Sequence, residues 1–100
     1  MVVVKSVKVT PREDGTIESV AVVTVANGDK VTSGDLGLAY ISVVKAVTPT
    51  VAGHVLGGAA VTNPGSVNND VTLTLYSLTA NADSLVAAGS ADWVIVAEQI

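Results

Sequence analysis

His54 is the only histidine in this 100-residue chain, so any catalytic triad or imidazole metal site would have to use it. A serine nucleophile needs a histidine base and an acid that orients the histidine, and Ser42, Ser66 and Asp70 are the candidate partners. None of them lies in a nucleophile-elbow or comparable motif. We therefore interpret His54 as a solvated or hydrogen-bonded histidine in a glycine-rich segment. We predict no catalytic residues and expect that the chain is not an enzyme.

Three oxygen-bearing side chains stand together at Asn68-Asn69-Asp70, and such a run could supply ligands to Ca²⁺. The spacing of an EF-hand is missing, however, and Asn and Asp before a strand are more often turn formers. The chain has no cysteine, which excludes disulfides and thiolate metal sites. We predict a turn at these residues, with no metal site and no cofactor.

The glycines and aromatic residues do not form a recognisable binding motif either. Phosphate-binding loops combine glycines with a following Lys-Ser/Thr pair or with a strand–helix junction, and neither context occurs, so the glycines are assigned to turns and close backbone packing. Sugar sites usually present stacking aromatic rings. The chain has only Tyr40, Tyr76 and Trp93, and we expect Trp93 to be a core residue because of its large apolar area.

The composition favours a β-sheet protein. Valine supplies 21 positions and threonine ten, whereas aromatic residues make up only 3% of the chain. Branching at Cβ restricts the side chain and suits the pleated surface of a sheet. We predict one all-β domain over residues 1–100, an antiparallel β-sandwich or squat barrel of six to seven strands with glycine-rich loops.

The first third predicts two hairpins. Residues 2–10 and 17–25 are valine-rich strands separated by a turn-forming stretch with Pro11 and Asp14-Gly15. Asn27-Gly28 then precedes a short apolar run, the pattern of a two-residue hairpin with a type I′ turn. The sequence therefore predicts an antiparallel meander.

The remaining elements follow from turn residues and alternation. Strict alternation over residues 71–76 predicts a strand with Val71, Leu73 and Leu75 on one face. Residues 54–61 fit either a short strand or a mobile loop. The other expected elements are a helical turn within 33–38, a strand over 39–47, a type II turn at Asn63-Pro64-Gly65-Ser66, a helical turn within 83–88, and a strand over 93–97 with Trp93 and Ile95 inward.

The apolar content points to a partner. The mean hydropathy of +0.57 indicates more apolar surface than a 10 kDa domain can easily bury. Small domains have a large surface for their volume. Lys5, Lys30, Lys45 and Asp70 interrupt the apolar runs, so no membrane-spanning helix is expected. The start has no basic leader before an apolar core, and we expect no secretory signal. We therefore predict that the excess apolar surface is buried against another protein.

Charge argues against direct binding of nucleic acid. The chain has five basic and nine acidic residues, a net charge of −4. No lysine or arginine follows Lys45. Proteins that neutralise phosphates need a basic patch or stripe, and this chain offers none, so we expect no nucleic-acid partner and no membrane partner.

Two segments are the predicted contacts with other subunits. Three consecutive valines open the first strand, and at least one must point away from the core because alternate residues face opposite sides. Lys5 and Lys8 protect such an exposed strand from unwanted pairing only in part. The glycine-rich span is the second segment. The predicted interface residues are Val2, Val3, Val4, Val51, Val55, Leu56 and Val61.

The order of several segments resembles one family of proteins. The segments are Lys5-Ser6-Val7-Lys8-Val9-Thr10, the Asp14-Gly15-Thr16-Ile17 hairpin, Asn69-Asp70-Val71-Thr72-Leu73-Thr74-Leu75, and the hydrophobic end Trp93-Val94-Ile95-Val96-Ala97. Together with the glycine-rich centre they resemble small all-β virion proteins of tailed bacteriophages, the head-decoration or cement class. The resemblance covers most of the chain and assigns no site residue.

That resemblance implies a structural virion protein. Such a protein is made in the host cytoplasm, decorates the capsid surface, often as a homo-oligomer, and stabilises the lattice without chemistry. Its expected partners are the major capsid protein or other virion subunits. The alternative is a phage tail or fibre module that recognises a receptor or carbohydrate.

Overall fold

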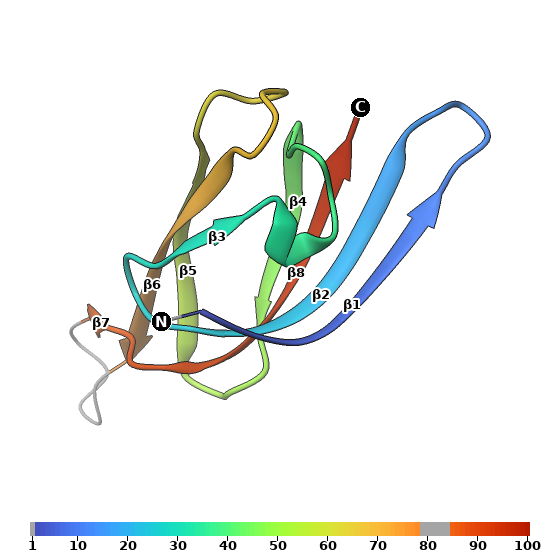
Figure 1. Cartoon of the computed structure of the whole chain (residues 1–100). Helices are drawn as coiled ribbons and strands as arrows, with labels where there is room; N and C mark the ends of the chain where they lie inside the picture. Colours follow the sequence, from blue (N-terminus) through green and yellow to red (C-terminus); the bar gives the residue numbers. More distant parts are fainter. Residues whose placement is uncertain (1, 79–84) are drawn as a thin grey trace.

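The structure is a computed structural model that describes residues 2–78 and 85–100. Within these residues it contains eight strands and one short 3₁₀ helix, arranged as two antiparallel sheets (Figure 1). This confirms the all-β sandwich, with eight strands rather than six or seven. The elements are β1 (Val3–Pro11), β2 (Ile17–Val25), β3 (Lys30–Thr32), η1 (Gly34–Leu36), β4 (Val43–Pro49), β5 (His54–Val61), β6 (Asp70–Leu78), β7 (Leu85–Ala87) and β8 (Ala91–Gln99).

The two sheets have different arrangements. The first has the strand order β1-β2-β8-β4, so that β1 and β4 are its edges. In the second, β6 pairs with β5 over most of its length and with β3 and β7 at its two ends. Since β1 and β2 form a hairpin at one side of the first sheet, this hairpin stands clear of β5 and β6 (Figure 1).

The core follows the alternation expected from the sequence. On β6, Val71, Leu73 and Leu75 are fully buried. On β8, Trp93 and Ile95 are fully buried, as predicted, and Trp93 is the largest side chain in the core. Side chains on one face of β6 and of β8 are thus buried between the sheets, which is the packing expected of two stacked sheets.

The prediction of a hairpin at Asn27-Gly28 is wrong. The chain does turn there, with the N–H of Asp29 donating to the carbonyl of Ala26 at 3.1 Å, but β2 and β3 belong to different sheets. Within the central pair only Gly28 has a positive φ, +86°, which is the pattern of a type II turn. The segment is therefore a crossing between the sheets, and the first third is not a meander.

Contacts with β6 explain this crossing. The N–H of Gly28 donates to the carbonyl of Leu73 at 2.8 Å, and the side-chain oxygen of Asn27 accepts from the N–H of Leu75 at 2.9 Å. These bonds attach the turn to the second sheet. As a result, β3 begins beside β6 instead of returning along β2.

Other expected elements are confirmed or corrected. The helical turn appears as η1, residues 54–61 are a strand, and the turn at Asn63-Pro64-Gly65-Ser66 has the bond from the N–H of Ser66 to the carbonyl of Asn63 and a positive φ at Gly65. The strand expected over 39–47 is shifted along the chain and is observed as Val43–Pro49. No helical turn spans 83–88, since Leu85–Ala87 is β7, while the start of that range lies outside the described residues.

Gly28→Val is expected to lower the free energy of unfolding by about 1 kcal/mol or more, because a β-branched residue resists positive φ. A Cβ at this position would meet no atom within 4 Å, so the cost is conformational strain and not a clash. Gly58→Val is the control, since Gly58 has open space and no positive φ. Urea denaturation of both variants measures the difference, and equal midpoints would contradict the assignment.

Candidate functional site

The strand β1 is the longest described strand whose residues are all exposed. All nine of its residues are exposed, and among the described strands it pairs only with β2, at the end of the first sheet. An edge strand with an unpaired side presents main-chain N–H and C=O groups that another chain can bond. The exposed edge is therefore a candidate site for contact with a partner.

A β-bulge at Lys5 turns the valines of β1 to one side. The pairing register shifts between Val4 and Ser6, so that Val4 lies opposite Val23 and Val7 lies opposite Ala21. Both partners on β2 are fully buried, and residues paired across two strands share a face. Without the extra residue, Val4 and Val7 would face opposite sides.

These inward-facing valines are not covered by the second sheet. Val4, Val7 and Val9 are 39%, 38% and 39% exposed, although they point to the side on which the core lies. The segment after η1 gives Val7 and Val9 partial cover, because a Cβ on Gly37 would lie 2.8 Å from Val9 Cγ2 and 3.3 Å from Val7 Cγ1. An apolar row beside an open sheet edge results.

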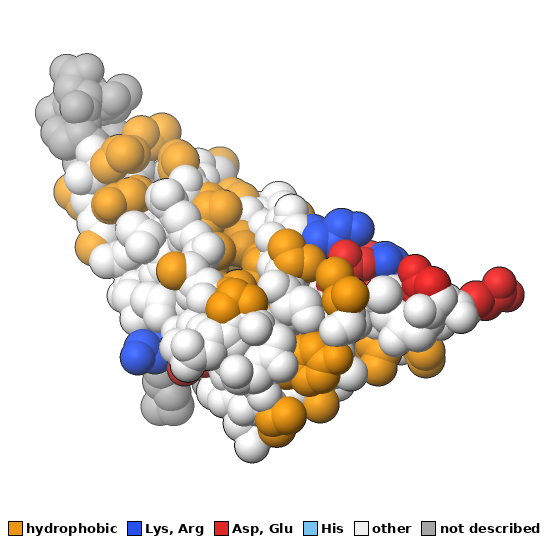
Figure 2. Space-filling model, turned by 90° about the horizontal axis from the view of Figure 1, so that it is seen from above, with side chains coloured by type: hydrophobic (Ala, Val, Ile, Leu, Met, Phe, Trp, Pro, Cys, Tyr) orange, Lys and Arg blue, Asp and Glu red, His pale blue; other side chains and the backbone are white. Residues whose placement is uncertain are grey.

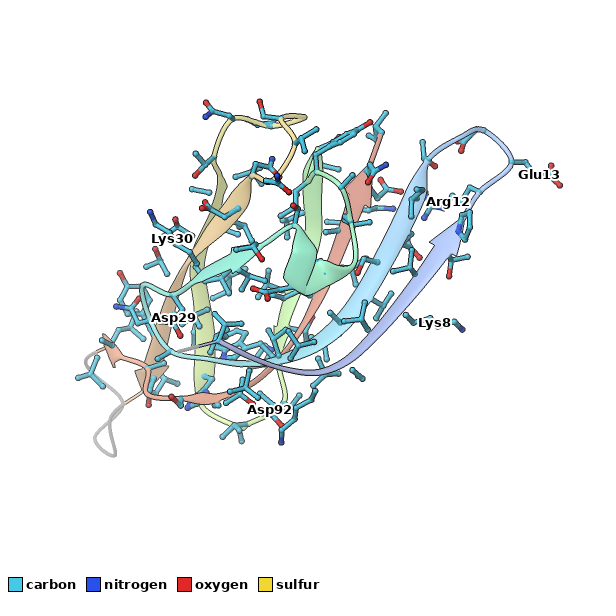
Figure 3. All side chains as sticks on the ribbon, viewed as in Figure 1. Lys8, Arg12, Glu13, Asp29, Lys30 and Asp92 are labelled. Carbon is cyan, nitrogen blue, oxygen red and sulfur yellow. The ribbon has the colours of Figure 1, made fainter. Side chains whose placement is uncertain are left out.

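The charge of β1 differs from that of the whole protein. Three of the five basic residues, Lys5, Lys8 and Arg12, lie between residues 5 and 12, and no acid lies in that range. Lys5 contacts Asp92 at 2.9 Å. Lys8 makes no hydrogen bond or ion pair with a described residue and extends away from the strand (Figure 3). Because Lys5 is paired with Asp92 and Arg12 with Glu18 and Glu98, Lys8 is the basic side chain of this range that lacks an ionic partner among the described residues.

Asp92 links three strands of the first sheet. Its Oδ1 accepts a hydrogen bond from the hydroxyl of Thr24 at 2.6 Å, and its Oδ2 accepts one from Lys5. The bond from Thr24 and then the bond from Lys5 hold the pKa of Asp92 below its usual value. Because the pKa is lowered in the folded state, this stabilisation is present above the usual pKa of an aspartate, about 3.9, and is lost as the pH falls below it.

Thr24→Val is expected to raise the pKa of Asp92, since the isosteric side chain removes the hydrogen bond with the largest effect. The pKa of Asp14 is lowered in the same way by Thr16, whose hydroxyl and N–H both donate to Asp14. NMR titration of the carboxyl carbons should therefore show that Thr24→Val moves only Asp92 and that Thr16→Val moves only Asp14. An unchanged titration of Asp92 in Thr24→Val would contradict the assignment.

The outer face of the first sheet is also apolar. Val20 and Val22 on β2 lie opposite Val96 and Val94 on β8, and all four are partly or largely exposed. Beyond one end of this row, Arg12 forms ion pairs with Glu18 and Glu98. Seen from above, the hydrophobic side chains form several separate patches among other side chains, and most of the visible charged side chains lie towards the right-hand end (Figure 2).

The predicted interface residues fall into two separate groups. Val3 and Val4 are exposed on β1, whereas Val51, Val55 and Leu56 are exposed in and before β5. The structure does not bring the groups together, because β1 is an edge of the first sheet and β5 pairs with β6 in the second. The remaining two, Val2 and Val61, are only partly exposed and pack against the core.

Several exposed apolar residues were missed by reasoning from the sequence. The sequence places Val7 and Val9 in the first strand but does not predict that they are exposed. The alternation of Val7, Lys8 and Val9 does indicate that the two valines share one face of the strand. Valines on the inner face of an edge strand are covered only if the other sheet extends that far. The other large apolar side chains that are exposed are Val20, Val43, Val67, Leu78, Leu85, Val86 and Ile100.

His54 packs instead of making side-chain hydrogen bonds. Its ring stacks on Trp93, with 6.0 Å between the ring centroids and an interplanar angle of 16°. The Nδ1 of His54 and the Nε1 of Trp93 are both buried without a hydrogen-bond partner among the described residues. The expectation of a solvated or hydrogen-bonded ring is therefore corrected in part, because the ring is half-buried against the core and makes no side-chain hydrogen bond with a described residue.

The structure separates His54 from its candidate catalytic partners. His54 lies opposite Ser77 near the end of β6, and Asp70 begins that strand. Seven residues of an extended strand span ~23 Å, so these two side chains do not meet. Ser66 follows the other end of β5, and Ser42 hydrogen-bonds with the N–H of Ile100 near the chain terminus. No Ser–His–acid arrangement is formed by these residues.

The turn before β6 contains a second correction. Asn68 has a positive φ of 60°, as a turn former does, but Asn69 is buried and bonds to the main chain of Ile41 through both its oxygen and its nitrogen. Within residues 2–78 and 85–100 no group of three or more potential metal ligands is found, and no pocket is detected. No helix in this part of the chain could cross a membrane.

Comparison with known proteins gives no relative from which a role could be transferred. No family model matches the chain, and no curated protein or solved structure is significantly similar to it.

Proposed function

We propose that this chain is a structural virion protein that decorates and stabilises a phage capsid through protein–protein contacts. The observation that carries the proposal is β1, a nine-residue edge strand exposed on both faces, with valines that its own second sheet leaves partly uncovered. Long, exposed, apolar edge strands are hazards for a soluble protein unless they are paired or covered. A partner that covers β1 removes this hazard.

The energetics favour binding to a lattice. Covering one valine contributes about 1.5 kcal/mol when the whole side chain is buried, and three of them on β1 are already about three-fifths covered. The apolar contribution of a single contact is therefore small, on the order of 2 kcal/mol. A homo-oligomer that places several linked copies on one capsid adds their contacts, so that weak individual contacts give firm overall attachment.

The buried position of Trp93 also favours a structural role over the recognition of sugars. Stacking on a sugar would need an accessible ring, and Trp93 is fully buried between the sheets. The remaining aromatic residues are two tyrosines, both half-buried. The proposed partner is the major capsid protein, at the virion surface.

The double substitution Val4→Thr and Val7→Thr is expected to weaken capsid binding severalfold and to change the unfolding midpoint little. Threonine keeps the shape and strand preference of valine but reduces the apolar area. Deleting residues 1–4 is a harsher test, because it also removes Val2, which packs against the core. The measurement is co-sedimentation with capsids assembled from the major capsid protein of the same genome.

Val67→Thr is the matched control, since Val67 is 68% exposed in a loop and should leave co-sedimentation unchanged. Absence of co-sedimentation by the wild-type protein would refute the capsid role. Specific retention on immobilised glycans in its place would support the tail or fibre module.

A further inference from the structure

We propose that the exposed edge of β1 binds an extended acidic segment of the partner as an additional strand of the first sheet. In this segment, apolar side chains alternate with Glu or Asp. The inference rests on the proposed assembly role and specifies the chemistry of its contact. It is argued from the exposed main chain of β1, from its valine row and from its charge.

The exposed edge supplies the geometry for strand addition. β1 ends the first sheet, and its nine residues are exposed. When an extended peptide joins a sheet edge, main-chain hydrogen bonds give affinity and alternate side chains give specificity. An added strand would bring one row of its side chains beside Val4, Val7 and Val9. Apolar side chains in that row would cover the three valines.

The other face of β1 selects acidic residues. Lys8 lies opposite Val20, whose neighbours Ser19 and Ala21 are buried, so Lys8 faces away from the core. It has no ionic partner among the described residues, whereas Lys5 at the bulge is already paired with Asp92. Opposite charges on neighbouring strands stabilise a sheet, so a carboxylate on the added strand fits this face.

Charge also makes a second copy of this chain a poor occupant. If two β1 strands paired antiparallel in one continuous sheet, paired residues would have to share a face. Every such register over residues 6–11 places the two Lys8 side chains on the same face, directly opposite or within a few residues of each other. Among the described residues Lys8 has no ionic partner that would offset this repulsion. A strand of opposite charge from a different protein avoids it.

The test uses a synthetic ten-residue peptide in which valine alternates with glutamate, with both ends blocked. We expect the wild-type protein to bind it, with weaker binding at high salt and with slower exchange of β1 amide hydrogens. A peptide in which lysine replaces each glutamate should bind at least about fivefold more weakly, the change expected from an exposed charge pair.

Lys8→Glu and Lys30→Glu form a matched pair of variants. Both reverse one exposed charge, but Lys30 lies on β3 in the second sheet. Lys8→Glu should weaken binding of the glutamate peptide by about tenfold and strengthen binding of the lysine peptide, whereas Lys30→Glu should change neither. Circular dichroism of both variants verifies that the fold is kept.

Three results would overturn the inference. These are equal binding of the two peptides, an equal effect of Lys8→Glu and Lys30→Glu, and a wild-type dimer in which β1 amides are protected by a second copy. These results are independent of the proposed capsid role. If the wild-type protein co-sediments with capsids while Lys8→Glu has no effect on either capsid or peptide binding, the capsid role stands and the docking at β1 fails.

Discussion

Asn69→Asp is expected to lower the free energy of unfolding by about 3–5 kcal/mol at neutral pH, the usual cost of a buried charge without compensation. Asn69 is only 6% exposed. Its Oδ1 accepts from the N–H of Ile41 at 2.8 Å, while its Nδ2 donates to the carbonyls of Ile41 at 2.8 Å and Asn63 at 3.3 Å. Aspartate keeps the acceptor but places a charged oxygen against two carbonyl oxygens.

The pH dependence of this variant gives a second test. Burial beside carbonyl oxygens raises the pKa of the introduced carboxyl group, because it disfavours the charged form. The destabilisation is therefore full above that raised pKa and becomes smaller as the pH falls through it, where a protonated carboxyl can donate to Ile41. Asn68→Asp is the control, since Asn68 is exposed and aspartate tolerates its positive φ. Equal denaturation midpoints for the two variants would contradict the role of Asn69.

Alternation along single strands was the part of the fold that the sequence predicted well. The buried faces of β6 and β8 follow from Val71, Leu73, Leu75, Trp93 and Ile95, because a strand that packs against one layer needs apolar residues at every second position. The Pro64-Gly65 turn was also predicted, since its local residues determine its geometry. These features depend on interactions between near neighbours in the chain.

Which strands and turns hydrogen-bond to each other was harder to predict. Asn27-Gly28 has the local signature of a hairpin, yet its bonds to Leu73 and Leu75 connect it to a strand more than 40 positions later. Asn69 has the signature of a turn former, but it bonds to Ile41, 28 positions away. Such long-range contacts leave no local pattern in a single sequence.

The exposure of the first strand could be predicted in part. At least one of its first three valines was expected to point away from the core, and Val3 and Val4 are exposed. The bulge at Lys5, which turns Val4 and Val7 to the same side, was not foreseen, because a bulge depends on the register with β2. The open position of the valine row depends in turn on how far the second sheet extends, which is a property of the packed molecule.

Ile95→Ala is expected to cost about 2–5 kcal/mol of stability, the range for truncating a buried isoleucine. Ile95 is fully buried, and in the register of the first sheet it lies between Ala21 on β2 and Val47 on β4. The surrounding side chains come from rigidly paired strands, so they relax little into the cavity. The loss would be a large fraction of the 5–15 kcal/mol typical of a small domain.

Val94→Ala provides the comparison, because Val94 is the neighbour of Ile95 on β8 but points to the outer face, opposite Val22. Its side chain is only partly buried, and its truncation leaves no enclosed cavity, so the expected cost is about 1 kcal/mol or less. Urea denaturation of both variants should therefore give a clearly lower midpoint for Ile95→Ala, with the same dependence of the free energy on urea concentration. A larger loss for Val94→Ala would mean that β8 presents the opposite face to the core, and the register of the whole first sheet would be wrong.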